Sequence, residues 1–398
     1  MKCVLLTNFS ITNYTGSEID TVTIANTLVK KFNCKVDIFT QDYGEPLIGI
    51  LDSSIRIITP NNIEKIRKKY DLIWAHHYPL LDYLVYKVKI KAKHIIYVCL
   101  SGVEPIESLP DYYQEISIIA AMSKKTKEKI LNRMSVKKKV ELFPNYATED
   151  FFNNEFKSST EVKRICIVSN HCPKELQELK ELAEKNDIEV DIYGEGHIKK
   201  LITKKVLSNY DVIISIGKTV YYSLALGIPT YCYDWFGGYG YINKENIIKA
   251  FHRNFCGRGF GKKMSSKELY DDILNNYNNI KIDLPYLQKY ARKNFCLEKN
   301  INKFFSLLND DNKVNYDKIY SDYLLLNTKA GLYIDNINHK NNAINSLKNE
   351  NEGLKKEITR LNNYIDDTVS KYKESTSWKI TYPLRKLKEI KCMIFKKK

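Results

Sequence analysis

Residues 212–233 read VIISIGKTVYYSLALGIPTYCY. An apolar run at residues 212–216 leads through a Gly-Lys-Thr step into a helical stretch at residues 220–226. Glycine and proline then break the helix before a second apolar run at residues 230–233. This order of strand, helix and strand is the repeating unit of a doubly wound α/β fold. Because such a unit places both strands in one parallel sheet, the stretch predicts that fold for the chain around it.

The same alternation continues outward and reaches from residue 3 to about residue 310. It pauses once, at residues 145–162, and then restarts. Two such halves predict two Rossmann-like domains, residues 1–150 and residues 161–310. Ligands of open α/β sheets bind beyond the carboxyl ends of the strands, so we expect a site in a cleft between the domains. The other predicted strands are residues 3–7, 35–40, 55–58, 72–75, 95–100, 116–120, 140–143, 164–168 and 190–193, with helices such as residues 19–32 and 124–133 between them.

Beyond residue 310 the strand pattern gives way to a heptad repeat. The repeat predicts an α-helical coiled coil over residues 317–372, and a buried Asn351 at an a position is typical of parallel homodimers. The alternative is a long helix that packs on its own globular domain, and the near absence of Gly and Pro favours the coiled coil. The a and d positions are Tyr333, Ile337, Ile344, Leu347, Asn351, Leu354, Ile358, Leu361, Ile365 and Tyr372.

The formal net charge is +16, and half of it lies in residues 371–398, which hold ten basic residues and two acidic ones. This concentration argues against a nucleic-acid-binding face. Apolar residues alternate with the charges, so we expect residues 373–398 to form a basic amphipathic tail on an anionic membrane surface. The nine cysteines contain no CxxC pair and indicate neither a disulfide framework nor a metal site. These features predict a cytoplasmic protein, peripheral at the inner face of the cell membrane.

Several short motifs resemble those of GT-B glycosyltransferases of the large group-1 kind, which have two Rossmann-like domains. The loop from Asn8 to Glu18, the strand that ends at His76 and His77, and the segment at residues 143–145 resemble the acceptor domain. In the second half, the strand-plus-glycine step VDIYGEG and the element LALGIPT resemble the donor domain. Their order and spacing over about 310 residues carry the resemblance. The segment ESTSWKITYPLR after the heptads resembles a closing motif of bacterial polysaccharide glycosyltransferases.

The resemblance implies transfer of a sugar from a nucleotide-sugar, which is a substrate rather than a cofactor. The implied acceptor is a cell-surface polysaccharide or a lipid-linked glycan. One departure is clear. Retaining members of the group carry two glutamates separated by seven residues before the A-x-G-x-P element, and Ile214 and Tyr222 stand at those positions here. The roles of these glutamates cannot be transferred, and the stereochemical outcome stays open.

A strand–glycine–helix junction binds phosphate through free backbone N–H groups and the positive end of the helix. Gly217, Lys218 and Thr219 form such a junction, and Lys218 adds a full charge. We therefore expect these three residues to stabilise the leaving diphosphate. The alternative is that Thr219 caps an ordinary helix, a role that would not need Lys218.

Further residues are candidates for donor binding. Family members place basic residues in the loop after the first strand of the second domain; Lys174 is the best match here, and His171 is a second candidate. Asn170 stands in the same loop as a further donor-binding candidate, and a solvent-facing turn is the alternative. Gly16 would let the backbone of the first domain approach the diphosphate, or would simply start a helix. Asp234 lies in a glycine- and aromatic-rich loop that suits contact with a base or sugar, and Arg258 is a candidate for a second phosphate clamp.

An inverting reaction needs a carboxylate or histidine to take the acceptor proton. Glu18 and Asp20 on the first helix are candidates, although acidic residues at a helix start also serve as dipole partners. His76 and His77 end a strand, and because consecutive strand residues point to opposite faces, one of them is expected to reach the cleft. A structural histidine is the alternative. No Asp-x-Asp pair asks for a metal ion.

Three other functions stay open at this stage. A GT-B sugar-nucleotide epimerase shares the fold but has little use for a coiled coil and a basic tail. A transferase of polyol phosphates also resembles it. The missing glutamates leave room for a non-catalytic GT-B protein that partners or scaffolds an active transferase, although the intact phosphate junction argues for an enzyme.

Overall fold

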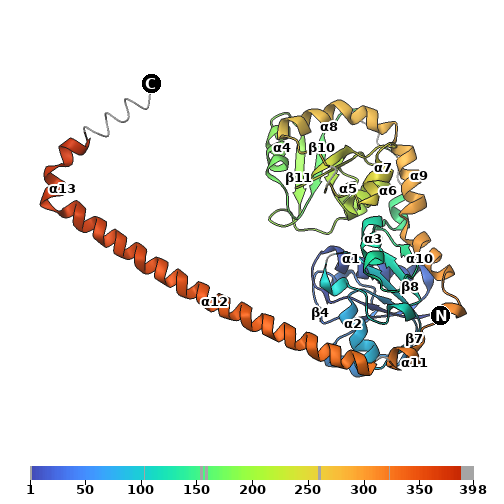
Figure 1. Cartoon of the computed structure of the whole chain (residues 1–398). Helices are drawn as coiled ribbons and strands as arrows, with labels where there is room; N and C mark the ends of the chain where they lie inside the picture. Colours follow the sequence, from blue (N-terminus) through green and yellow to red (C-terminus); the bar gives the residue numbers. More distant parts are fainter. Residues whose placement is uncertain are drawn as a thin grey trace. The chain divides into compact units, whose positions relative to one another are not determined.

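The computed structural model describes residues 2–102, 104–152, 156, 160–258, 261–321 and 323–386, without the side chains of residues 323–337. The chain divides into two compact units, Met1–Ser321 and Asp322–Lys398. The first unit contains two large, mostly parallel sheets with helices around them, and the second is helical (Figure 1). The predicted mixed α/β fold with a long carboxyl-terminal helix is confirmed.

The N-terminal half of the first unit is built on a seven-stranded parallel sheet of order β5-β3-β1-β6-β7-β8-β9. Each strand is a short aliphatic run whose neighbours alternate between the two faces. Leu5 packs with α2 (Tyr78–Asp82) and α11 (Tyr316–Ser321) on one face, and Leu6 packs with α1 (Gly16–Phe32) and α10 (Leu297–Ser306) on the other. The strands are β1 (Cys3–Thr7), β3 (Lys35–Phe39), β5 (Arg56–Ile58), β6 (Lys69–Ala75), β7 (Lys91–Cys99), β8 (Ile118–Ala121) and β9 (Val140–Leu142).

The main helices of this half are α1 (Gly16–Phe32), α2 (Tyr78–Asp82) and α3 (Lys124–Arg133). Helix α3 begins after Ser123, whose hydroxyl accepts a hydrogen bond from the Thr126 N–H and so caps the helix. Helix α1 starts three residues earlier than predicted, at Gly16, so that Glu18 and Asp20 lie in its first turns.

The C-terminal half has a five-stranded sheet of order β11-β10-β12-β13-β14, in which only the last strand is antiparallel. Its helices include α4 (Lys174–Glu184), α6 (Lys218–Leu226), α7 (Ile247–His252), α8 (Ser266–Lys281) and α9 (Leu284–Asn294). The strands are β10 (Arg164–Val168), β11 (Glu189–Tyr193), β12 (Val212–Ser215), β13 (Thr230–Asp234) and β14 (Gly237–Tyr241).

Strand β14 corrects one expectation, because its glycine- and tyrosine-rich sequence was taken for a loop. The chain turns at Trp235 and Phe236 and pairs back along β13. A side chain at Gly238 would stand 1.8 Å from the Cys232 carbonyl oxygen, so the close approach requires glycine. Such an edge strand shows little of the apolar alternation by which strands are predicted.

After the C-terminal half, the chain returns to the N-terminal half. Helix α10 (Leu297–Ser306) returns to the N-terminal half, where the Phe304 ring lies 5.1 Å from that of Phe143. Helix α11 (Tyr316–Ser321) follows it, and the Tyr316 hydroxyl accepts a 2.7 Å hydrogen bond from the Ala92 N–H. The globular unit therefore includes residues 317–321, which the heptad pattern had assigned to the coiled coil.

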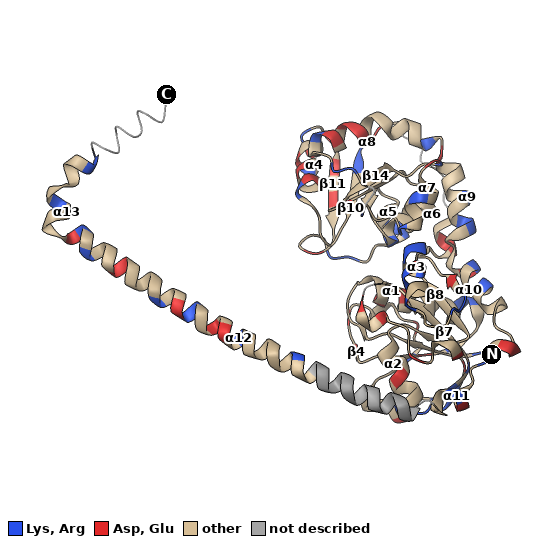
Figure 2. Ribbon diagram, viewed as in Figure 1, with Lys and Arg blue, Asp and Glu red and all other residues tan. Residues whose placement is uncertain are grey.

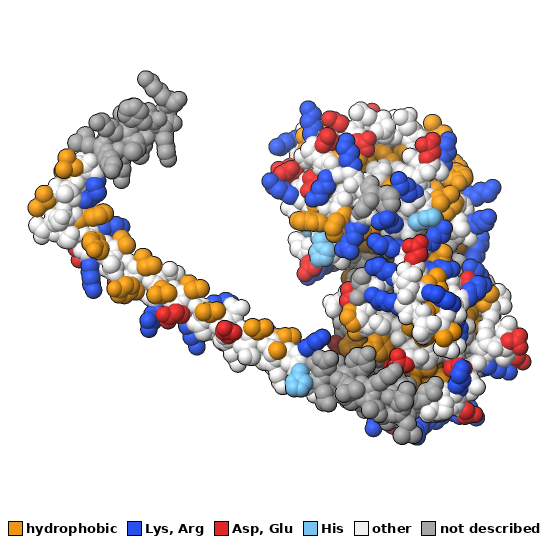
Figure 3. Space-filling view, in the orientation of Figure 1, with side chains coloured by type: hydrophobic (Ala, Val, Ile, Leu, Met, Phe, Trp, Pro, Cys, Tyr) orange, Lys and Arg blue, Asp and Glu red, His pale blue; other side chains and the backbone are white. Residues whose placement is uncertain are grey.

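The described part of the second unit includes α12 (Tyr323–Glu374) and α13 (Thr376–Ile380). Figure 3 shows hydrophobic side chains in a row along α12. The described a and d positions are all exposed, for example Leu347 at 62% and Ile358 at 58%. Tyr333 and Ile337 lie outside the described side chains. Residues 387–398, which carry the apolar tail positions Leu387, Ile390, Met393, Ile394 and Phe395, lie outside the described residues.

Among the described helices, none combines the length and the apolar character that crossing a membrane requires.

Candidate active site

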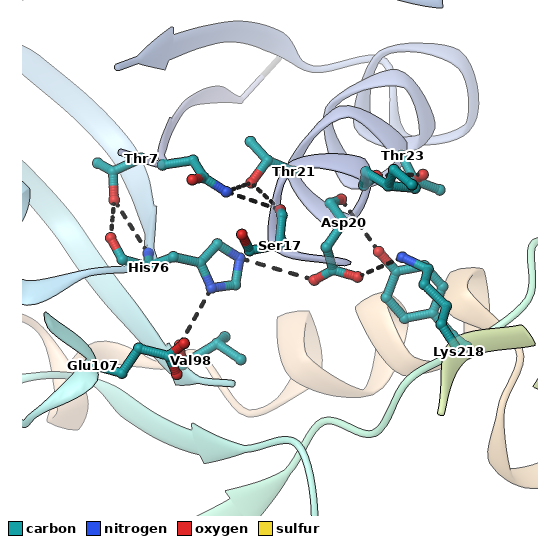
Figure 4. A network of polar contacts seen from close by, with 12 residues as sticks. Thr7, Ser17, Asp20, Thr21, Thr23, His76, Val98, Glu107 and Lys218 are labelled. Carbon is teal, nitrogen blue, oxygen red and sulfur yellow. Dashed lines mark hydrogen bonds and ion pairs between the residues drawn. The ribbon is translucent and has the colours of Figure 1, made fainter. Parts of the chain in front are cut away.

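Side chains from both halves of the globular unit meet at the start of α6 (Figure 4). We name this group the junction network; it consists of Asp20 on α1, His76 after β6, Tyr146 after β9, and Lys218 and Tyr222 on α6. It lies beyond the carboxyl end of strand β12, which is where ligands of doubly wound sheets bind. Three of the predicted site residues, Asp20, His76 and Lys218, are thus brought together.

Lys218 is the first residue of α6. It follows Gly217, whose φ of 56° is in the region that favours glycine. Its Nζ lies 3.0 Å from Asp20 Oδ1 and 4.8 Å from the centre of the Tyr146 ring, and its side chain is 14% exposed. Burial opposes the charge, but the Asp20 carboxylate and the Tyr222 hydroxyl outweigh burial, so the pKa of Lys218 lies above its ordinary value. Lys218 is a cation in this site.

Asp20 is buried, with 2% of its surface exposed. Its Oδ1 accepts the hydrogen bond from Lys218. Its Oδ2 lies 4.0 Å from His76 Nε2, which is too long for a hydrogen bond. The Tyr146 hydroxyl donates to the Asp20 main-chain carbonyl at 3.2 Å and fixes this turn of α1. One carboxylate oxygen is therefore paired across the halves, and the other faces the histidine.

The structure assigns opposite tautomers to the two consecutive histidines. His76 Nδ1 lies 3.2 Å from the Val98 carbonyl, which can only accept, so Nδ1 carries the proton and Nε2 bears the lone pair. His77 Nδ1 instead accepts a 3.1 Å hydrogen bond from the Phe9 N–H, so its proton is on Nε2. Of the two neutral rings, only His76 presents a free basic nitrogen, and that nitrogen has no hydrogen-bond partner among the described residues.

Burial keeps both rings neutral. It lowers the pKa of His76, although Asp20 acts in the opposite direction. It lowers the pKa of His77 to about 4, and the neighbouring His76 adds to this shift. His77 also has a φ of 61°, a conformation that a residue with a side chain rarely adopts. Such strain at the end of β6 is typical of functional positions.

Glu18 binds the loop before α1, whereas Asp20 binds Lys218. Its Oε2 accepts hydrogen bonds from the main-chain N–H groups of Thr12 and Asn13, and its Oε1 accepts one from the Thr15 hydroxyl. Both carboxylate oxygens thus hold the loop that precedes α1. Gly16 follows this loop as the first residue of α1, and a side chain there would meet no described atom within 4 Å.

Thr219 lies inside α6 and is buried, so it does not cap the helix; the residue at the cap position is Gly217. A side chain at Gly217 would also meet no described atom within 4 Å. The space beside Gly217, at the start of α6, is therefore open among the described residues. This corrects the alternative in which Thr219 was an ordinary helix cap.

The other predicted donor residues lie in neighbouring loops. Lys174 starts α4, is 87% exposed, and pairs with Glu178 at 3.2 Å. Asn170 follows β10, where Ser169 and Asn170 approach Gly194 so closely that a side chain on Gly194 would stand 2.0 Å from the Ser169 carbonyl oxygen. The loops after β10 and β11 are therefore in contact, but neither residue belongs to the junction network.

Asp234 and Arg258 form a second cluster, at the end of β13. Asp234 accepts a 2.8 Å hydrogen bond from the Phe236 N–H, and burial raises its pKa although Arg258 acts against the shift. The Arg258 guanidinium carbon lies 4.5 Å from the centre of the Phe236 ring. The two predicted residues are thus close to each other through a shared turn.

Contacts beside this cluster join the two halves. Asn254 Oδ1 accepts hydrogen bonds from Asn145 at 3.0 Å and from the Tyr221 hydroxyl at 2.8 Å. Lys124 Nζ, on the lysine-rich helix α3 (Figure 2), lies 2.7 Å from His252 Nε2. None of Tyr146, Tyr222 and Asn254 was predicted as a site residue. Only Tyr222 carried a signal, because it stands where retaining relatives have a glutamate.

Among the described residues, no three His, Cys, Asp or Glu side chains lie together as metal ligands.

The comparisons with known proteins agree with this architecture. No protein-family model and no curated protein sequence matches the chain. Anabaena HepE, solved with UDP and glucose, is 11% identical over 77% of this chain and 100% of its own, with a TM-score of 0.52. A glycosyltransferase from Rickettsia africae is 15% identical over 77% and 97%, also at 0.52, and a variant of S. aureus TarM is 12% identical over 77% and 99%, at 0.51. The chain therefore has the GT-B fold of these glycosyltransferases.

Proposed function

We propose that the protein is a glycosyltransferase that moves a sugar from a nucleoside diphosphate sugar to a glycan acceptor, either a cell-surface polysaccharide or a lipid-linked glycan. The observation that carries the proposal is the junction network at the start of α6. In a GT-B fold, the Lys218 cation lies 3.0 Å from one oxygen of the buried Asp20 carboxylate, and the other oxygen lies 4.0 Å from the lone pair of His76. These are the groups that a glycosyl transfer requires.

The donor diphosphate binds at the start of α6 in this proposal. The helix end supplies free N–H groups and a partial positive charge, and Lys218 supplies a full one. The open position beside Gly217 leaves room for the phosphates. HepE was solved with UDP and with UDP-glucose, so UDP is the first nucleotide to test.

In the transfer step, the bond between the sugar's anomeric carbon and the phosphate oxygen breaks. The acceptor hydroxyl forms the new bond to that carbon and gives up its proton. The electron pair stays on the diphosphate, whose negative charge Lys218 and the α6 N–H groups stabilise. Asp20 and His76 lie beside Lys218, and the His76 Nε2 lone pair is the free base that takes the proton. The His77 Nε2–H is a neutral donor that suits a sugar hydroxyl.

The competing functions leave different products. A glycosyltransferase releases a nucleoside diphosphate and needs an acceptor for rapid turnover. A sugar-nucleotide epimerase returns an isomeric nucleotide-sugar without any acceptor. A polyol-phosphate transferase releases a nucleoside monophosphate, and a non-catalytic partner protein binds the nucleotide and releases nothing. Product analysis therefore separates all four.

The test begins with a thermal-shift panel of nucleosides, nucleoside diphosphates and nucleotide-sugars. A ligand at 100 times its dissociation constant stabilises the folded chain by about 2.7 kcal/mol. We expect at least one nucleoside diphosphate and its sugar conjugate to raise the melting temperature, and the matching nucleoside to have no effect. Stabilisation by the nucleoside alone, or by no nucleotide, would contradict the proposed diphosphate site.

The helical unit supports a proposal about assembly and location. The apolar row along α12 is solvent-exposed in a single copy, and a second copy in parallel register would bury it. We therefore propose a homodimer through α12. We also propose that residues 373–398 hold the protein on the cytoplasmic face of an anionic membrane; this charge-rich tail contains the exposed Trp378 and Ile380. A membrane-bound dimer would stand close to a lipid-linked acceptor.

A further inference from the structure

The start of α6 concentrates positive charge. The positive end of a helix is an unfavourable place for a lysine, yet Lys218 is the first residue of the helix and is only 14% exposed. Among the described residues, the one carboxylate paired with it is Asp20, which comes from the other half of the globular unit. Asp20 thus occupies the place beside the Lys218 ammonium group at which an external anion would bind.

The contacts of Asp20 are incomplete. Its Oδ2 faces the His76 Nε2 lone pair at 4.0 Å, and this buried nitrogen has no hydrogen-bond donor among the described residues. A buried acceptor without a donor is costly. Lys218 stabilises the Asp20 carboxylate through its other oxygen, Oδ1. Between Oδ2 and His76 Nε2, no described residue supplies a proton that either atom could accept in a hydrogen bond. An acceptor hydroxyl would supply that proton.

We propose that Asp20 is an internal placeholder for the donor diphosphate: donor binding draws Lys218 from Asp20 to the phosphates and thereby releases Asp20 and His76 to accept the proton of the acceptor. This inference rests on the proposed function, and it adds an order of events. The donor must bind first, because only then does Asp20 lose the cation that neutralises it.

The proton balance of the exchange is explicit. While Lys218 is paired with Asp20, His76 is neutral. Once Lys218 turns to the phosphates, an uncompensated carboxylate lies beside Nε2 and makes the neutral His76 ring a stronger base. During transfer, the acceptor O–H bond breaks, its proton moves to Nε2, and the Asp20 carboxylate stabilises the resulting charge. The titratable groups that face Asp20 are His76, Lys218 and the hydroxyls of Tyr146 and Tyr222; Asp150 and Glu298 act on these tyrosines.

The decisive variant is Asp20→Asn in the full chain, with the affinity for UDP measured by calorimetry. If Asp20 competes with the diphosphate, removing its charge frees Lys218, and UDP binds about tenfold more tightly, within the range of typical coupling energies. If Asp20 is only structural, UDP binds equally or more weakly. Asp42→Asn is the matched control, because it removes one charge from an exposed strand of the same half and should leave the affinity unchanged.

A second measurement needs no change at Asp20 and covers the case in which that variant does not fold. The chain has seven histidines, so selective 15N labelling gives few signals, and His76→Gln identifies those of His76. Adding UDP to the unmodified protein should raise the pH at which His76 Nε2 becomes protonated. Uridine, which lacks phosphate, should not.

The outcomes separate the two proposals. If UDP and the other nucleoside diphosphates do not bind at all, the proposed function and the placeholder role both fail. If UDP binds to the unmodified protein, but Asp20→Asn does not tighten its binding and the pH at which His76 is protonated stays the same, the placeholder role is overturned and the proposed function stands.

Discussion

Replacing Lys218 by Met removes the ammonium group that stands 3.0 Å from Asp20 Oδ1 and leaves the apolar stem in place. The carboxylate that remains is 3% exposed at its side chain and has no other cation within hydrogen-bond reach among the described residues. Breaking a buried ion pair by removing one partner costs about 3–5 kcal/mol, because an uncompensated charge stays behind. Since Lys218 is partly exposed, we expect a loss of about 3 kcal/mol.

The double variant Lys218→Met/Asp20→Asn tests the physical reason for this loss. It removes both charges, so the buried charge penalty disappears and most of the stability should return. Two residues in direct contact show interaction energies of about 0.5–3 kcal/mol in such a cycle, and this pair should lie near the upper end.

Urea unfolding of the unmodified chain, the two single variants and the double variant measures these terms. For a slope of about 3 kcal/mol per molar urea, the single variant should unfold at a midpoint about 1 M lower. Equal stability of Lys218→Met and the unmodified chain, or losses that simply add in the double variant, would show that the pair is not an ion pair in solution.

Three further predictions concern other parts of the chain. The pKa of His77 is about 4 in the folded protein against 6.5 unfolded, so the unfolded state binds more protons between these values; about 3 kcal/mol of stability should be lost as pH falls from 6.5 to 4, and His77→Gln should reduce this slope in urea unfolding. An unchanged slope would refute the assignment. Light scattering should find a dimer for the full chain and a monomer for a chain ending at Ser321; two monomers would exclude the α12 dimer. Anionic vesicles should sediment the full chain at low salt, and a chain ending at residue 372 should stay in solution; equal binding of both would exclude the tail as the membrane contact.

The strands were predictable where aliphatic residues fill a buried run, as in β1 and β10, whose predicted bounds match the structure. Such runs have no other stable place than the inside of a sheet. Strand β14 was missed because glycine replaces the apolar residues wherever another backbone comes close. The return of α10 to the N-terminal half was missed for a different reason: its amphipathic face shows that it packs, but not against which sheet.

The candidate site was predictable residue by residue but not as a network. The glycine step before α6 and the strand that ends in two histidines are visible in the sequence. The contact between Lys218 and Asp20 joins residues 198 positions apart, and no local pattern records it. The tautomers of His76 and His77 depend on the Val98 carbonyl and the Phe9 N–H, which only the folded sheet places beside them. From their sequence positions, Glu18 and Asp20 were equally good candidates for the catalytic base. In the structure, both carboxylate oxygens of Glu18 accept hydrogen bonds from the loop before α1.

The most direct test of glycosyl transfer at the junction network is the rate at which the chain releases nucleoside diphosphate from the nucleotide-sugar that stabilises it best. It should be measured with the unmodified chain, with Lys218→Ala, and with Lys267→Ala, which removes an exposed lysine from α8. Loss of one group that stabilises the leaving charge costs about 2.7–4 kcal/mol in the transition state, so Lys218→Ala should be about 100- to 1,000-fold slower while Lys267→Ala keeps the full rate. A full rate for Lys218→Ala, or no release of nucleoside diphosphate by the unmodified chain, would contradict the account.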